Sequence, residues 1–190
     1  MLAPAPAPVP VLRTARLTVR LAAVEDAARI AAYYGRNRAH LAPFEPPRAP
    51  EFFTPEFWAE RAIAWRRERE LDQSCRLFLF QDGEPIGVAG LAPIQRGPFQ
   101  CASLGYSVDA GREGQGLMSE ALRAVIRCAF EDLKLHRLQA NHLPENVRSA
   151  ALLARLGFVR EGYAKEYLFI GGAWRDHVLN SLTNPAPTTP

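Results

Sequence analysis

The 190-residue chain has few of the residues on which several protein classes depend. Its three cysteines, Cys75, Cys101 and Cys128, are far apart and odd in number, so neither a disulfide framework nor a zinc knuckle is predicted. Lysine and arginine form no runs, and a net charge of +3 does not by itself indicate a nucleic-acid partner. No apolar stretch approaches the roughly 20 residues of a membrane span. These absences favour a protein of the reduced cytoplasm, without membrane or nucleic-acid contacts.

The sequence also lacks the signatures of two common kinds of catalysis. The four histidines, His40, His136, His142 and His177, do not have metal-ligand spacing, and no GxSxG motif marks a nucleophilic serine. We therefore expect neither a metal centre nor a covalent serine intermediate.

Proline is concentrated towards both ends of the chain. The first ten residues, MLAPAPAPVP, have neither a positively charged leader nor an apolar core, and NPAPTTP at the other end has a similar composition. We expect flexible tails over residues 1–10 and 184–190, and one folded domain over residues 11–183. The apolar content of 48% is sufficient for a sizeable core in a domain of this length.

Between the tails, periodicity and turn signals divide the chain into strands and helices. Asp82-Gly83 is a strong hairpin signal between two strands, while Asn146 is the expected N-cap of the last helix and Gly157 its stop. Hairpins followed by strand–helix–strand units predict an α+β fold with a mixed sheet and helices on its faces. Strands are expected near residues 16–21, 77–80, 86–91, 102–108, 138–141, 163–170 and 174–182, and helices near 26–34, 55–71, 117–131 and 146–156.

The stretch GREGQGLM at residues 111–118 has the composition of a phosphate-binding loop but lacks the residues of phosphoryl chemistry. A P-loop needs lysine and then serine or threonine after its last glycine, and a dinucleotide fingerprint needs a small residue where Ser119 stands. The stretch still contains two glycines, Gly114 and Gly116, and the start of a helix. The free N–H groups there can bind an anion that does not itself react. Coenzyme A is such a ligand, because its diphosphate serves as a handle. A glycine-rich bend that binds nothing is the alternative.

The order of the motifs resembles that of the GNAT superfamily of acyl-CoA-dependent N-acetyltransferases. Its loop motif, Gln/Arg-x-x-Gly-x-Gly/Ala, matches at Gly114 and Gly116 and departs at Gly111. Further segments resemble the RimJ/RimL-type branch, the ribosomal-protein alanine N-acetyltransferases. These segments are Thr14-x-Arg16-Leu17-x-x-Arg20, HLAPFEP at residues 40–46, GQGLMSEAL at 114–122 and LLARLGFVREGYAKEYLFIGGAWRDHVL at 152–179.

The resemblance implies a central mixed, mostly antiparallel sheet that splays beside residues 104–108 and holds acetyl-CoA in the gap. Pantetheine would pair with the exposed main-chain edge, and the N–H of Val108 or of a neighbouring residue would polarise the thioester carbonyl. The residues that the resemblance assigns to acetyl-CoA are Tyr106, Val108, Arg112, Gly114, Gln115, Gly116, Leu117, Met118, Asn146 and Ser149.

Asn146 and Ser149 each have two interpretations. They can be an ordinary helix cap and a first-turn residue. By the family pattern, Asn146 contacts pantetheine and Ser149 serves the departing thiolate. Many family members carry a tyrosine acid at the slot that Leu153 occupies here, so either Ser149 donates the proton or little donation is needed, because a thiol has a pKa of about 8.5.

The general base is the least defined part of the predicted site. Glu45, Glu113 and Glu166 are candidates, and we prefer Glu166 because it lies in the late strand region that lines the acceptor side in the family. Phe44 and Glu45, on the proline-rich bend, are expected to shape the entrance for an acceptor peptide. Tyr106 and Trp174 are each either a core aromatic or a wall of the site, and the core is favoured for Trp174.

The resemblance implies an enzyme that transfers acetyl from acetyl-CoA to the N-terminal α-amine of a protein, an alanine-starting ribosomal protein, by direct amine attack. Two alternatives stay open: acetylation of a small-molecule amine, and a catalytically silent module that binds coenzyme A. The sequence does not distinguish a monomer from a homodimer.

Overall fold

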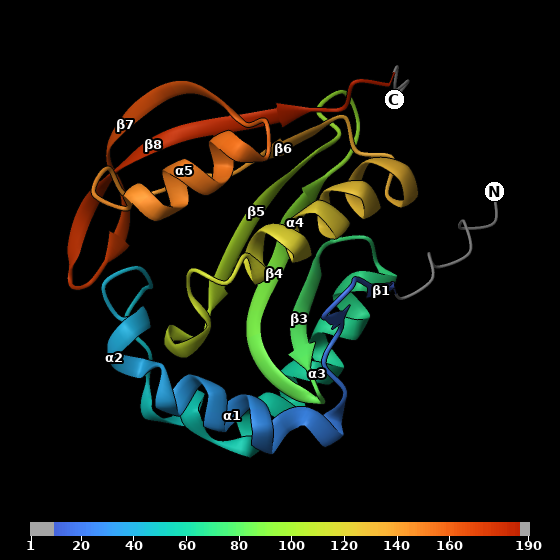
Figure 1. Ribbon diagram of the computed structural model, residues 1–190, viewed down its shortest axis with the longest axis vertical. Coiled ribbons are helices and arrows are strands. Elements are labelled where there is room, and N and C mark those ends of the chain that lie inside the picture. Colours follow the sequence, from blue (N-terminus) through green and yellow to red (C-terminus); the bar gives the residue numbers. More distant parts are fainter. Residues whose placement is uncertain (1–9, 187–190) are drawn as a thin grey trace.

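The computed structural model describes residues 10–186, and most of the two predicted tails, residues 1–9 and 187–190, lies outside that range. Eight strands form one sheet in the order β1-β2-β3-β4-β5-β6-β8-β7 (Figure 1). Neighbouring strands are antiparallel except β5 and β6, which are parallel. The predicted mixed sheet is therefore confirmed. The strands are β1 Val11–Arg13, β2 Thr18–Arg20, β3 Cys75–Gln81, β4 Glu84–Gln95, β5 Cys101–Val108, β6 Arg137–Gln139, β7 Val159–Ile170 and β8 Ala173–Thr183.

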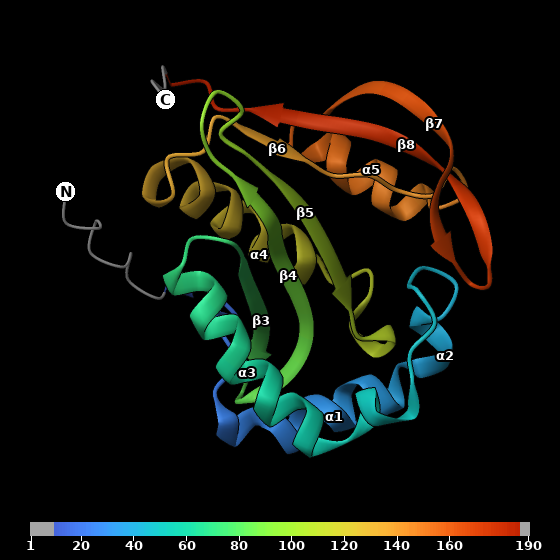
Figure 2. The same cartoon turned by 180° about the vertical axis from the view of Figure 1, so that it is seen from behind.

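Helices cover both faces of this sheet. One helix, α4, crosses one face, and α1 and α3 lie on the other (Figures 1 and 2). After its last α-helical residue, α4 continues into a π-helical turn over Cys128–Asp132. Asn146 caps α5 as predicted, because its side chain accepts the N–H of Ser149. The helices are α1 Ala27–Arg36, α2 Arg38–Leu41, α3 Pro55–Glu70, α4 Leu117–Arg127 and α5 Val147–Arg155.

Strand β3 shows why the sheet needs cover on both faces. Side chains alternate between the two faces of a strand, and here all of its central residues are apolar. Leu77 and Leu79 join an aliphatic core with α4, whereas Phe78 and Phe80 join an aromatic core with α1 and α3. Two separate cores thus fix the helices that flank the later site.

The sheet opens after the third residue of β5. Pairing with β6 runs from Cys101 to Ser103 and then stops, whereas β4 stays paired with β5 as far as Val108. The Asp109 N–H donates to the Ile86 carbonyl of β4 at 2.8 Å. Because backbone groups alternate in direction along a strand, the N–H groups of residues 106 and 108 point to the other edge. Within residues 10–186 no strand pairs with that edge beyond Ser103, which confirms the predicted splay.

A buried ion-pair cluster holds the first strands to α1. The Asp26 side chain, in a residue only 1% exposed, lies 2.6 Å from both Arg20 and Arg29 and accepts the Ala23 N–H at 2.8 Å. Burial acts to raise the pKa of Asp26, but the hydrogen bonds of Arg20 and Ala23 and the two guanidinium charges outweigh it and lower the pKa.

We predict that Asp26→Asn lowers the free energy of unfolding by about 3 kcal/mol at pH 7, because the two arginines lose their anion. A carboxyl with a lowered folded pKa stabilises the protein above its unfolded pKa of about 3.9, and that stability is lost as the pH falls through the folded value. Urea unfolding should therefore show the variant and the parent converging in acid. Glu25→Gln, in the exposed neighbour, is the control. A pH-independent difference would contradict the assignment.

Candidate active site

The glycine-rich loop between β5 and α4 is fixed from one side by the end of α1. The Asp109 carboxylate accepts hydrogen bonds from Arg36 Nε at 2.8 Å, Asn37 Nδ2 at 3.0 Å and the Gly111 N–H at 2.9 Å. Asn37, which is 1% exposed, accepts the Ala110 N–H at 2.9 Å in return. Burial opposes ionisation of Asp109, but these hydrogen bonds lower its pKa. The first amides of the loop are therefore used to hold its shape.

Arg16 fixes the loop from the other side. Its Nη1 donates to the Gln115 carbonyl at 3.0 Å, and its guanidinium forms an ion pair with Glu120 at 2.7 Å. The Glu120 side chain is 19% exposed, and helical periodicity alone does not reveal its partner, a cation 104 residues away.

The middle of the loop keeps its amides free. The Arg112 N–H donates to the Asp109 carbonyl at 2.9 Å, so this amide is not free to bind an anion. Gly114 and Gly116 adopt left-handed φ values of 73° and 76°, a conformation that glycine favours. The amides of residues 114–118 have no acceptor within residues 10–186, and those at the start of α4 also carry the positive end of its dipole. The loop can thus bind an anion.

A pair of hydroxyl groups crosses the opening between β5 and α5. The Tyr106 hydroxyl lies 2.6 Å from Ser149 Oγ, and the Ser149 N–H donates to Asn146 Oδ1 at 3.0 Å. Burial raises the pKa of Tyr106, and the bond to Ser149 offsets this in part, so the phenol stays protonated near neutrality. Sequence reasoning assigned each residue to the site but missed their contact, because 43 residues separate them without a local signal.

A second feature lies where the bend after α2 approaches the β7–β8 turn. A cavity of about 280 Å³ there is lined by Glu45, Tyr34, Phe52 and Gly171, among other residues. Glu45 forms an ion pair with Arg48 at 3.0 Å, and Phe44 is exposed beside it. The bend and the late hairpin, distant in sequence, thus meet at one side of the molecule.

The predicted base lies on the outermost strand. Glu166 is exposed at a bulge of β7 with a φ of 47°, and its N–H donates to Asp176 Oδ1 at 2.8 Å. Its assignment as the base stays a prediction. Trp174, predicted in the core, is 62% exposed and packs edge-on against Phe169. That prediction was wrong because the tip of the β7–β8 hairpin projects beyond the cover of α5 (Figure 1).

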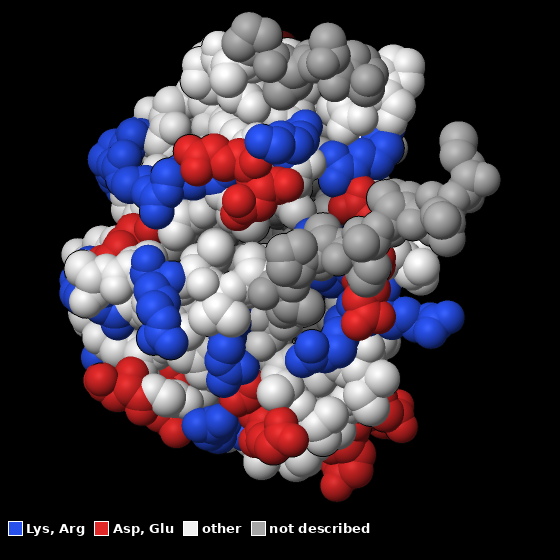
Figure 3. All heavy atoms as spheres, turned by 90° about the vertical axis from the view of Figure 1, so that its right-hand side faces the viewer, with Lys and Arg blue, Asp and Glu red and all other residues white. Residues whose placement is uncertain are grey.

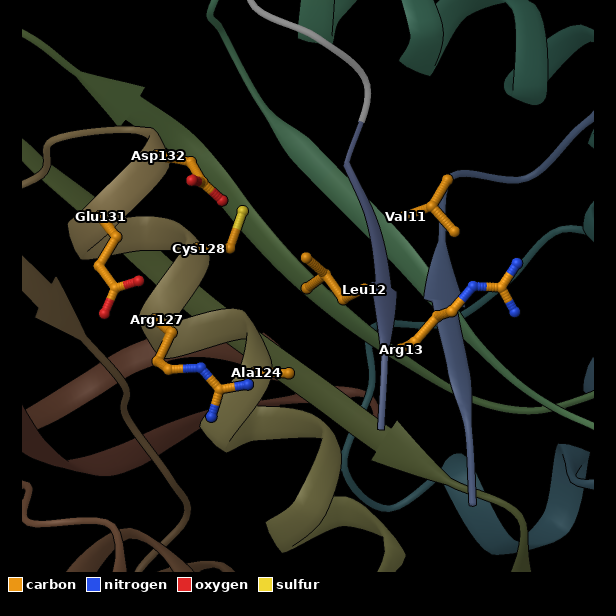
Figure 4. A pocket seen from close by; sticks show the side chains of 8 residues that line it. All are labelled: Val11, Leu12, Arg13, Ala124, Arg127, Cys128, Glu131 and Asp132. Atoms are coloured by element: carbon orange, nitrogen blue, oxygen red, sulfur yellow. The ribbon is translucent and has the colours of Figure 1, made fainter. Parts of the chain in front are cut away.

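A further pocket of about 260 Å³ lies between β1 and the far end of α4 (Figure 4). The 11 residues of α4 span about 16 Å, so this pocket is well separated from the free amides. Burial, aided by Cys75 and Asp132, raises the pKa of its Cys128 thiol to about 12, which removes the thiolate needed for nucleophilic chemistry. The pocket is therefore not part of the candidate site.

Over residues 10–186, no helix has the length and apolar character needed to cross a membrane. The same residues contain no group of three or more His, Cys, Asp or Glu side chains arranged to hold a metal ion. On the face shown in Figure 3, acidic and basic side chains are interspersed.

Comparison with known proteins identifies the family. Residues 16–159 match the acetyltransferase (GNAT) domain. The chain is 46% identical over 176 residues to the [ribosomal protein uS5]-alanine N-acetyltransferase of Escherichia coli strain K12, covering 92% of this chain and 91% of the relative. It is 34% identical to the probable N-acetyltransferase YjcK of Bacillus subtilis strain 168, over 92% and 97% of the two chains. The chain therefore belongs to the GNAT acetyltransferase family.

Solved structures agree with this assignment. The ribosomal-protein-S5-alanine acetyltransferase of Vibrio fischeri superimposes with a TM-score of 0.91 and 39% identity, covering 95% of this chain and all of that one. Mycobacterium smegmatis RimJ, in complex with CoA-disulfide, superimposes with a TM-score of 0.85 and 31% identity. The match covers 94% of this chain and 88% of that one. The predicted resemblance is confirmed, and the chain is an enzyme, an acetyltransferase.

The free amides lead to a prediction for coenzyme A binding. Gly116→Leu should abolish it, because a φ of 76° strains a residue with a side chain and the new side chain would contact Arg16, which holds the loop in shape. Gly83→Leu is a matched control: Gly83 also has a left-handed φ, 84° against 76°, and its added Cβ would also meet an arginine, at 3.7 Å against 3.6 Å. Both variants should lose similar stability, about 1–3 kcal/mol. Equal coenzyme A affinities in a calorimetric titration would contradict the loop assignment.

Proposed function

We propose that this acetyltransferase moves the acetyl group of acetyl-CoA to the N-terminal α-amine of a ribosomal protein that begins with alanine, of the uS5 type. The observation that carries the proposal is 46% identity, over 92% of the chain, to an enzyme whose name states that acceptor. The structural neighbour in complex with CoA-disulfide supports acetyl-CoA as the co-substrate.

The geometry of the opened sheet supports the same co-substrate. Pantetheine carries amide groups that can pair with the free edge of β5 at Tyr106 and Val108, as an added strand would. Its diphosphate would lie on the amides of residues 114–118, with Arg112 adding charge. Asn146 and Ser149, at the start of α5, would contact pantetheine from the opposite side of the opening.

In this arrangement the reaction needs no acyl-enzyme. The neutral amine attacks the thioester carbonyl carbon, a C–N bond forms, and the carbonyl oxygen takes up negative charge that the Val108 N–H stabilises. Collapse breaks the C–S bond, and the sulfur leaves with the electron pair. The hydrogen-bonded pair Ser149 and Tyr106 supplies a proton to the thiolate, while the amine proton passes to a base or to water.

The acceptor must lose a proton before it can attack. An α-amino group has a pKa of 7.7–8.0 against about 10.4 for lysine, so near pH 7 about a tenth of the former is neutral. The difference of about 2.5 units corresponds to about 3.4 kcal/mol in favour of a peptide N-terminus. We assign Glu166 as the base and Phe44 and Glu45 as walls of the acceptor entrance. Only modest help from the base is required.

An acceptor panel tests the function directly. The enzyme is incubated with acetyl-CoA and alanine-starting peptides, lysine peptides with blocked N-termini, or small amines, and thiol release is followed. Turnover with the alanine-starting peptides is expected. Turnover with small amines alone would show that the enzyme acetylates small-molecule amines instead. Coenzyme A binding without thiol release would show that the protein is a catalytically silent module that binds coenzyme A.

The two hydroxyl groups give a separate prediction about the leaving group. Ser149→Ala should lower kcat by about 10- to 100-fold, because it removes the donor closest to the thiolate, and Tyr106→Phe by less. The KM for acetyl-CoA should change little in Tyr106→Phe, since the edge of β5 binds through its main chain. Steady-state kinetics with the best peptide measure both parameters. Full kcat in both variants would mean that the thiolate leaves without a protein donor.

A further inference from the structure

Two helices, α2 and α5, approach one carboxylate of the glycine-rich loop. Glu113 is paired with the guanidinium of Arg148, from the first turn of α5. His40 Nε2, from α2, lies 3.7 Å from the same carboxylate. The loop, α2 and α5 are therefore connected through Glu113, next to the free amides.

The Glu113–Arg148 pair connects the loop that follows β5 to the first turn of α5. Arg148 immediately precedes Ser149, whose hydroxyl contacts Tyr106 of β5 across the opening between β5 and α5. Figures 1 and 2 both show the start of α5 and the loop before α4 on the same side of the diverging strands. An acyl carrier held between this loop and β5 must therefore pass beside the Arg148 guanidinium.

The charges of the loop need a mobile cation. Glu113 places a negative charge next to amides that would receive a diphosphate, and like charges repel. The lysines of the sequence, Lys134 and Lys165, lie outside the loop and α5. Arg16 is held by Glu120 and the Gln115 carbonyl. Arg112, on the loop itself, is one cation for the diphosphate, and a second would be an arginine across the opening with a freer side chain than Arg16.

Arg148 has the properties of that arginine. Its side chain is 72% exposed, and Glu113 is the one partner recorded for it among residues 10–186. An exposed ion pair contributes only about 0.2–1 kcal/mol, whereas a guanidinium can bind a phosphate through two charge-assisted hydrogen bonds. Exchange of Glu113 for a phosphate is therefore favourable.

We propose that Arg148 is a phosphate-binding arm that Glu113 holds in the ligand-free enzyme, and that it transfers to the phosphates of the acyl carrier when the carrier binds. The inference rests on the proposed function, because it requires acetyl-CoA on the loop amides. It assigns opposite roles to the two partners: Arg148 strengthens binding of the carrier, and Glu113 competes with its phosphates.

The test is a calorimetric titration of coenzyme A into the full chain and its variants. Arg148→Ala should weaken binding about tenfold, as expected for loss of a charge-assisted contact. Glu113→Gln should tighten binding about threefold, in line with the small free energy of an exposed pair. The double variant should bind more tightly than Arg148→Ala, because it also removes the Glu113 charge, but less tightly than Glu113→Gln. Arg66→Ala, an exposed arginine on α3 at the other face of the sheet, is the control for loss of one positive charge.

A purely structural contact cannot give effects of opposite sign. If Arg148→Ala binds coenzyme A like Arg66→Ala, or if Glu113→Gln weakens binding as much as Arg148→Ala does, the inference is wrong. Thermal unfolding without ligand checks that all variants fold. A parent enzyme that fails to bind coenzyme A would contradict the proposed function itself, so the two failures are distinguishable.

Discussion

Strand β5 is paired along its whole length on one side, yet on the other it is paired for only three residues. Beyond Ser103 a row of backbone donors and acceptors faces an opening instead of a neighbouring strand. Unpaired main-chain groups need hydrogen-bond partners. Within residues 10–186, neither α5 nor the strands β6, β7 and β8 supply them to β5 beyond Ser103. In the proposed complex, the amide groups of an extended acyl carrier pair with these main-chain groups in the opening.

In the proposed complex the acyl carrier meets mostly main-chain groups, and the side chains act by holding that main chain in place. Asp109 and Asn37 tie the start of the loop to α1, and Arg16, between β1 and β2, ties its end to α4. Between these anchors the amides stay unsatisfied. Such a site is rigid before the ligand arrives, which limits the entropy lost on binding. It also explains how a loop without lysine or a hydroxyl group can hold a diphosphate.

Features set by neighbouring residues could be predicted from the sequence, and features set by distant contacts could not. Asn146 as a cap, the Asp82-Gly83 turn and the left-handed glycines of the loop each follow from local backbone preferences. The contacts of Tyr106 with Ser149 and of Arg16 with Glu120 join segments far apart in the chain, and no spacing rule predicts them. Trp174 is apolar, but its exposure depends on how far a hairpin projects.

The central claim is that the edge of β5 and the amides of residues 114–118 receive the acyl carrier, and amide hydrogen exchange tests it most directly. Exchange would be compared with and without a saturating concentration of coenzyme A, at single-residue resolution by NMR. The account predicts strong slowing at Val108 and at residues 114–118, with little change at the turn around Gly83. Unchanged exchange at these amides, with slowing at another surface, would contradict it.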